Sequence, residues 1–81
     1  MKERRLVDVS AISPEAWRLL RVAAGYDQRD VERAVDGLVQ AHISMLESGT
    51  RALSADRREQ LLDLYTEELT DEQVEALVEH F

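Results

Sequence analysis

The sequence predicts a compact all-α domain built from five helices. In five segments the apolar residues stand three and four positions apart, which is the spacing of one helix face. Residues that commonly cap helices precede these segments, and glycines follow the first three. The expected helices cover residues 14–24, 28–35, 40–47, 55–67 and 71–80, within a single domain over residues 13–81.

The first helix has a well-marked start and end. Ser13 can accept a hydrogen bond from the amides of the first turn, and Pro14 suits the first helical position, where no N–H is needed. Trp17 and Leu20 then begin an apolar stripe. Gly25 adopts left-handed backbone conformations without steric cost, so we expect it to end the helix.

The second and third helices stand on either side of Gly37. Asp27 and Asp30 fit an approximate capping box at the start of the second helix. The buried face of this helix is expected to contain Val31, Ala34 and Val35. Leu38 can fill the space between the two helices, and Gly49 is expected to end the third. The inward residues of the third helix are Ile43 and Leu46.

The last two helices also have capping residues. Ser54 precedes the fourth helix, whose apolar residues are Leu61, Leu64 and Tyr65. Thr70 and Gln73 form a capping box for the fifth helix. The apolar stripe of the fifth helix consists of Val74, Leu77, Val78 and Phe81.

Length and composition limit the class of protein. The chain has 81 residues and no cysteine, so disulfides cannot reinforce the small core of one short domain. No apolar run approaches the roughly 18 residues that a membrane-spanning helix needs. We therefore expect a soluble, cytoplasmic protein, for which dimerisation is one way to gain buried surface.

The net charge of −7 is unevenly distributed along the chain. Residues 1–52 contain eight Lys/Arg and eight Asp/Glu, whereas residues 53–81 contain two Arg and nine Asp/Glu. A surface that meets nucleic acid is therefore expected within the first two thirds. The acidic last third is either a solvated face or a region that steers the choice of partner.

The N-terminal residues 1–12 allow two interpretations. Lys2, Arg4 and Arg5 are typical of a basic arm. The alternation in Leu6-Val7-Asp8-Val9 also fits a short strand that pairs with a second copy. So few residues do not decide between the two.

An ordered set of residues in the middle of the chain carries a functional signal. It comprises Leu20-Arg21, Gly25 and Gln28, then Gly37, then Ile43-Ser44, Leu46-Glu47 and Gly49. In this order the residues resemble the XRE/Cro family of phage-repressor-like helix-turn-helix proteins, over about residues 17–65. The resemblance implies a lambda-repressor-like fold and a DNA-binding transcriptional regulator.

Two departures from the family pattern lie in the second helix and the turn after it. Gln28 and Gly37 are nine positions apart, where the family has eight. Glu32 or Arg33 stands where the family has a small alanine. We therefore expect either a longer second helix or a bulged turn, which would change how the third helix is presented.

The resemblance makes residues 40–47 the recognition helix, which enters the major groove of DNA. The implied base contacts are Gln40, Ala41, His42, Ser44 and Met45. Gln40 can bond adenine through two hydrogen bonds, and Ala41 and Met45 offer apolar contact to a thymine methyl. An exposed helix face without a ligand is the alternative.

Residues around this helix are implied as phosphate contacts. Gln28 would face the DNA backbone and also brace the third helix, while Glu47 would hold the region after that helix in place. The implied phosphate contacts are Gln28, Arg29, Arg51, Lys2, Arg4 and Arg5, and Arg33 can add another. Solvated charge is the alternative for each arginine.

The sequence thus predicts a homodimeric repressor that reads a palindromic operator. The expected dimer interface consists of Val74, Leu77, Val78 and Phe81, although the same stripe can simply cover the monomer core. The other hypothesis is a protein-interaction module, antitoxin-like or an adaptor, that uses this fold without reading DNA.

Enzymatic and metal-binding functions find no motif in the sequence. His42 and His80 are far apart, and the chain has neither a cysteine nucleophile nor a glycine-rich phosphate loop. Pairs such as Glu67-Glu68 are sequence neighbours, and neighbours on a helix do not face each other. We expect no enzyme, no metal and no cofactor.

Overall fold

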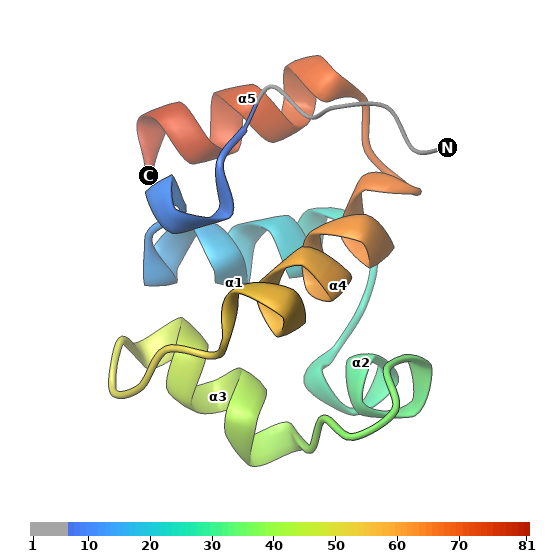
Figure 1. The fold of residues 1–81 in the computed structure, drawn as a ribbon. Coiled ribbons are helices and arrows are strands. Elements are labelled where there is room, and N and C mark those ends of the chain that lie inside the picture. The colour runs from blue at the N-terminus through green and yellow to red at the C-terminus, as the bar shows by residue number, and fades with distance from the viewer. Residues whose placement is uncertain (1–6) are drawn as a thin grey trace.

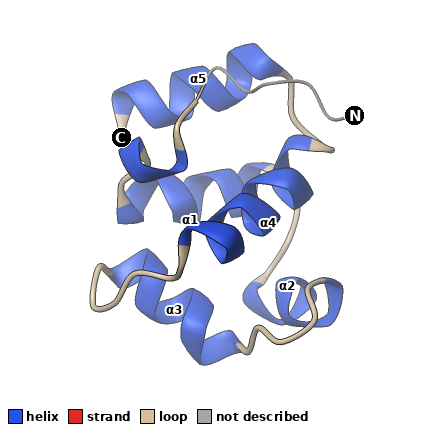
Figure 2. Ribbon diagram, in the orientation of Figure 1, coloured by secondary structure: helices blue, strands red, loops and turns tan. Residues whose placement is uncertain are grey.

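A computed structural model describes residues 7–81 and confirms the all-α class (Figures 1 and 2). Five α-helices follow one 3-10 helix, and residues 7–81 contain no strand. In chain order the elements are η1 (Val9–Ala11), α1 (Pro14–Ala23), α2 (Gln28–Ala34), α3 (Gln40–Ser48), α4 (Ala55–Thr66) and α5 (Asp71–His80). Every α-helix begins at the expected residue and ends within one residue of the expected end.

Helix α1 is the centre of the arrangement. It packs against α3 on one side and α5 on the other, so α3 and α5 lie at opposite ends of the molecule (Figure 1). Helix α2 packs on α3, and η1 packs on α4. This order places α5, which belongs to the acidic last third, across α1 from α3.

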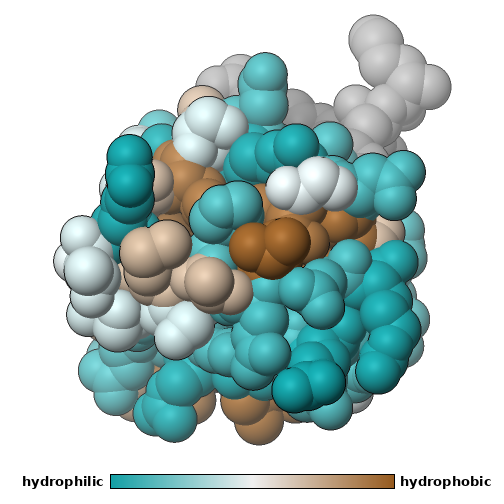
Figure 3. Space-filling view, turned by 90° about the horizontal axis from the view of Figure 1, so that it is seen from below, coloured by the Kyte–Doolittle hydropathy of each residue, from teal (hydrophilic) through white to brown (hydrophobic). Residues whose placement is uncertain are grey.

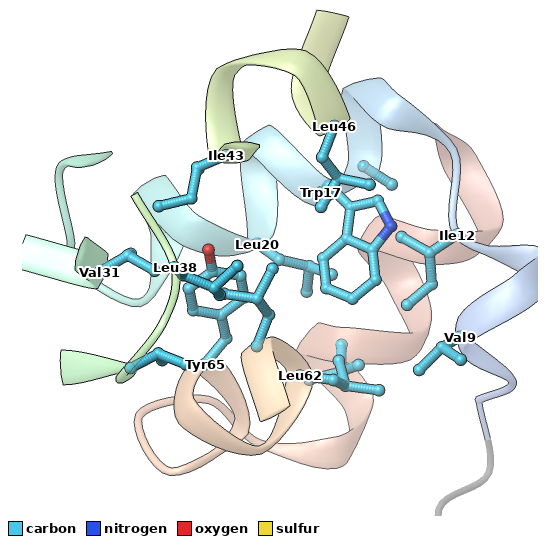
Figure 4. Close-up of a cluster of buried hydrophobic side chains, with 14 residues drawn as sticks. Val9, Ile12, Trp17, Leu20, Val31, Leu38, Ile43, Leu46, Leu62 and Tyr65 are labelled. Atoms are coloured by element: carbon cyan, nitrogen blue, oxygen red, sulfur yellow. The ribbon is translucent and has the colours of Figure 1, made fainter. Parts of the chain in front are cut away.

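One apolar core joins all of these elements (Figure 4). The rings of Trp17 and Tyr65 meet edge to face, with centroids 6.3 Å apart and an interplanar angle of 63°. The fully or almost fully buried side chains are Val9, Ile12, Ala16, Trp17, Leu20, Val31, Val35, Leu38, Ile43, Leu46, Leu61, Leu62, Tyr65 and Val74. The expected core positions of α1 and α3 are thus confirmed.

One core expectation is wrong, and two other positions differ from the simplest interpretation of the pattern. Ala34 is exposed, because α2 ends there and the chain leaves the helical conformation at Val35. Leu64 is half-buried, while its neighbour Leu62 is buried, since α4 also packs against η1. Val9 lies in the 3-10 helix rather than in a strand, and its side chain enters the core.

Side-chain caps fix most of the helix starts. Asp27 and Asp30 bond each other's backbone N–H groups at 3.0 and 2.7 Å, and Thr70 and Gln73 do the same at 2.8 and 3.1 Å. Ser13 accepts a hydrogen bond from the first turn of α1 at 3.1 Å. Its hydroxyl also donates to the backbone oxygen of Phe81 at 2.6 Å, which links the end of α5 to the start of α1.

Residues 35–39 form the turn between α2, which ends at Ala34, and α3, which begins at Gln40. Arg57 of α4 donates from Nη1 to the Asp36 carbonyl oxygen at 2.6 Å and to Gln60 Oε1 at 3.2 Å. Its guanidinium fills the space beside Gly37, whose φ is +84°. One arginine of α4 therefore holds this turn in place.

We predict that Gly37→Ala destabilises the fold through two separate effects. The positive φ costs about 1–2 kcal/mol for a residue with a Cβ atom. The added carbon would also clash with the Arg57 guanidinium and displace it. Free energies of unfolding from urea denaturation measure the sum of the two effects.

Two further variants separate these effects. Gly25→Ala is the matched control, because φ is +90° and the added carbon meets nothing within 4 Å in the described part of the chain. In an Arg57→Ala background the cost of Gly37→Ala should fall to that of the control. An unchanged cost in that background would contradict the contact.

Candidate nucleic-acid interface

Helix α3 presents a face with no buried side chain. Ile43 and Leu46 point into the core, and their spacing turns the intervening residues outward. Ala41 and Ser44 are exposed, while Gln40, His42 and Met45 are half-buried. Seen from the side of α2 and α3, apolar and weakly polar side chains gather next to a strongly hydrophilic area (Figure 3). All five implied base contacts are therefore accessible.

Gln40, the first residue of α3, is held by two side chains of α2. Its backbone N–H donates to Glu32 Oε2 at 2.8 Å. Its side-chain Nε2 donates to Gln28 Oε1 at 3.4 Å. Residues 28 and 32 are one helical turn apart, so they share the face of α2 that meets α3. The side-chain oxygen of Gln40 is the acceptor left for a ligand.

An ion pair behind this face ties α3 to α1. Arg21 Nε and Nη2 donate to the two oxygens of Glu47 at 2.7 and 3.1 Å. The side chains are only 11% and 5% exposed, so this is a nearly buried, two-bond pair. The hydrogen bond to Glu47 raises the pKa of Arg21 above its ordinary value. Arg21 therefore stays charged.

The same pair reaches α2 and the turn before it. Arg21 Nη1 donates to the Tyr26 carbonyl oxygen at 2.8 Å, and Gln28 Nε2 donates to Glu47 Oε1 at 3.2 Å. A continuous chain of bonds thus runs from Arg21 through Glu47 and Gln28 to Gln40. The resemblance implied that Glu47 holds the region after α3, but its contacts lie on α1 and α2 instead.

His42 and Met45 border a hollow beside α3. His42 Nδ1 accepts a hydrogen bond from the Val39 backbone N–H at 3.4 Å, which leaves Nε2 as the donor of the neutral ring. The hollow has a volume of about 330 Å³. Its lining residues are His42, Met45, Arg51, Ala52, Leu53 and Ser54. Arg51 therefore lies next to the face of α3.

The remaining implied phosphate contacts are scattered. Arg29 is exposed at the start of α2. Arg33 is exposed and pairs with Asp30 at 3.1 Å, so its charge is partly compensated. The implied contacts of the basic arm, Lys2, Arg4 and Arg5, lie outside the described residues.

The stripe on α5 belongs largely to the monomer. Val74 is only 3% exposed and lies in the core, so its expected place in a dimer interface is wrong. Leu77 and Val78 are half-buried and pack against the core. Phe81 is 51% exposed and is the member of the stripe most accessible to a partner.

Residues 7–81 contain no cluster of three or more His, Cys, Asp or Glu side chains that could hold a metal ion. None of the helices in this range has both the length and the apolar character needed to cross a bilayer.

Residues 6–58 match a family described as Domain of unknown function (DUF8599), and the chain belongs to this family. The matched stretch is more than half of the chain and includes α1, α2 and α3 in full. Comparisons with curated proteins and with solved structures gave no match. The family region therefore contains the whole bond chain from Arg21 to Gln40.

The structural roles of Arg21 and Glu32 were not predicted from the sequence. The sequence does contain a local signal for the role of Arg21. Arg21 follows the buried Leu20, and Glu47 follows the buried Leu46. Charged residues of opposite sign at the borders of two apolar stripes can meet when the stripes pack. The role of Glu32 has no such signal. Its partner is a backbone N–H of α3, so the contact can be inferred only when the position of α3 is known.

We predict that Arg21→Met destabilises the fold by about 2–3 kcal/mol, because it leaves a nearly buried carboxylate without its cation. The double variant Arg21→Met/Glu47→Leu should recover part of this loss, since no unpaired charge remains. Urea denaturation of the wild type, both single variants and the double variant measures the coupling.

The matched control for this cycle is Arg33→Ala. The Arg33–Asp30 pair is exposed, so its loss should cost less than about 1 kcal/mol. Strictly additive losses for Arg21 and Glu47 would contradict the pairing.

We predict a loss of stability at alkaline pH that depends on Tyr65. Burial, with a further contribution from Glu47, raises the pKa of this phenol well above 10. The unfolded chain releases the proton near pH 10, whereas the folded chain retains it. The stabilisation is therefore complete below about pH 10 and is lost as the pH rises further.

Unfolding free energies measured across this pH range check the effect of Tyr65. Tyr65→Phe, although less stable at neutral pH, should lose less stability per pH unit above pH 10. Tyr26→Phe is the comparison variant: Tyr26 is only half-buried, and although burial also raises its pKa, its removal should change the slope less than Tyr65→Phe does. Equal slopes for the wild type and Tyr65→Phe would refute the assignment.

Proposed function

We propose that the protein is a sequence-specific, DNA-binding transcriptional regulator that inserts α3 into the major groove. The observation that carries this proposal is the chain of bonds from Arg21 to Gln40. It fixes the first residue of α3 from behind, while the outward side chains stay accessible. Groups held in this way can read base edges with little loss of conformational entropy.

The chemistry of the α3 face supports this use. Gln40 offers an amide for adenine, His42 and Ser44 offer donors, and Ala41 and Met45 offer apolar contact for thymine methyls. The outward face before Glu47 carries no charged side chain, as suits base edges rather than phosphates. Arg51 lies beside the face and Arg29 is exposed at the start of α2, so both can supply phosphate contacts.

The charge distribution is compatible with a polyanion at α3. The acidic excess lies in residues 53–81, and α5 lies across α1 from α3 (Figure 1). At an ionic strength of 0.1 M the Debye length is about 10 Å, so charges on the far side are largely screened. The overall charge of −7 therefore does not argue against DNA binding at this face.

The proposed regulator is a cytoplasmic homodimeric repressor of the XRE/Cro type. One such domain covers few base pairs, and two copies on half-sites one helical turn apart gain affinity and specificity. Phe81, with the exposed parts of Leu77 and Val78, provides the apolar surface for the second copy. A palindromic operator follows from the two-fold symmetry of such a dimer.

A protein-interaction module is the second candidate function. Val39, at the start of α3, is 47% exposed and adjoins the exposed Ala41, which together form an apolar surface. The Glu32 carboxylate lies next to this surface, because it accepts the Gln40 backbone N–H, and Asp27 and Asp30 are further acids at the start of α2. An apolar patch beside fixed acidic groups also suits a basic protein partner.

We predict that the protein enriches a short inverted repeat from a random pool of duplex DNA. Gln40→Ala should lower affinity for that operator by 10-fold or more and relax the preference at one base pair per half-site. Arg51→Ala should weaken binding to all sequences and reduce the slope of log K against log salt by about 1. Fluorescence anisotropy at several salt concentrations measures both effects.

Arg18→Ala is the control for Arg51, because Arg18 is an exposed arginine of α1. It should leave the salt slope unchanged. A folded wild-type protein that binds no DNA even at low salt would overturn the proposal and favour the interaction module.

A further inference from the structure

Glu32 places a fixed carboxylate at the leading end of α3. Its Oε2 atom accepts the Gln40 backbone N–H at 2.8 Å, and the residue is otherwise exposed. The residue before α3 is Val39, which has no side-chain oxygen to cap the helix, so the cap comes from α2. A negative charge at a helix N-terminus is favourable, which holds this carboxylate in place.

This charge is unusual for a surface that meets DNA. Within α3 the single carboxylate is Glu47, which is nearly buried and neutralised by Arg21. Of the cations near Glu32, Arg29 is exposed one turn earlier on α2, and the other two have partners of their own. Arg33 pairs with Asp30, and Arg57 donates to the Asp36 carbonyl oxygen. The Glu32 carboxylate is therefore a fixed negative charge directly beside the first side chain proposed to read a base.

We propose that Glu32 is a specificity-determining residue of the DNA-binding face, an inference that rests on the proposed function. A carboxylate repels the phosphates that dominate non-specific complexes. It tolerates, or accepts a hydrogen bond from, the exocyclic amines of cytosine and adenine in the major groove. Glu32 thus weakens binding in a wrong register more than binding to the operator, and discrimination increases.

The physical consequence is a lower affinity for non-specific DNA and a higher selectivity for the operator. A protein with α3 capped by a neutral group would bind non-specific DNA more tightly, with little change at the operator. The resulting loss of discrimination matters because non-specific sites greatly outnumber operators.

The test variant is Glu32→Gln, whose amide oxygen can still accept the Gln40 N–H while the charge is removed. Binding to the selected operator and to a scrambled duplex is measured by anisotropy over a range of salt concentrations. We expect affinity for the scrambled duplex to rise about 5- to 10-fold, with its salt slope steeper by about 0.9. Operator affinity should change about 2-fold or less, so the specificity ratio falls.

Two controls separate the local charge from net charge and from the cap. Glu79→Gln removes the same charge from an exposed position on α5, and should leave the specificity ratio unchanged. Glu32→Asp keeps the charge, and should keep the ratio close to the wild-type value. Circular dichroism and urea denaturation establish that each variant is folded.

The outcomes distinguish this inference from the proposed function. If the wild type binds the operator but Glu32→Gln and Glu79→Gln have equal specificity ratios, the role of Glu32 is wrong while the proposed function stands. A ratio that falls as far in Glu32→Asp as in Glu32→Gln would likewise overturn it, because the charge is then irrelevant. Absence of DNA binding by the wild-type protein would instead remove the proposed function.

Discussion

The ion pair between Arg21 and Glu47 is the constraint on which the arrangement of the first three helices depends. One guanidinium bonds both oxygens of a carboxylate on α3 and the Tyr26 carbonyl oxygen before α2. The remaining capacity of that carboxylate is used by Gln28, which also bonds Gln40. Apolar contacts alone permit small rotations of a short helix, whereas these directional bonds set its orientation. The orientation of the α3 face therefore depends on Arg21 and Glu47, neither of which belongs to that face.

Helix positions were predictable from the sequence because their causes are local. Caps such as Asp27 with Asp30 and stops such as Gly49 act within one turn of the helix they limit. The exposed side of α3 followed from the inward direction of Ile43 and Leu46 alone. The burial of Val9 was not predictable, because a three-residue 3-10 helix has no periodic pattern and its partner α4 lies about fifty residues away.

The interactions that fix the candidate site join residues far apart in the sequence, so they could not be predicted from it. Arg57 reaches Asp36 over 21 positions, and Arg21 reaches Glu47 over 26. Neither distance is encoded in spacing or propensity. A resemblance to a family could imply that Gln28 braces α3, but it could not supply the contact of Glu32, a residue at which the chain departs from the family pattern. Val74 illustrates the opposite error, since one apolar stripe cannot reveal whether core or partner covers it.

The hydroxyl of Ser13 restricts which residues can occupy its position. It accepts a hydrogen bond from the backbone N–H of Ala16 while it donates to the backbone oxygen of Phe81. Aspartate caps helices as well as serine does, yet an ionised carboxylate has no proton to donate and would set its lone pairs against that oxygen. Glycine would leave both groups without a partner. The junction where the first and last helices meet thus requires a side chain that donates and accepts at once, a demand that neither helix would impose alone.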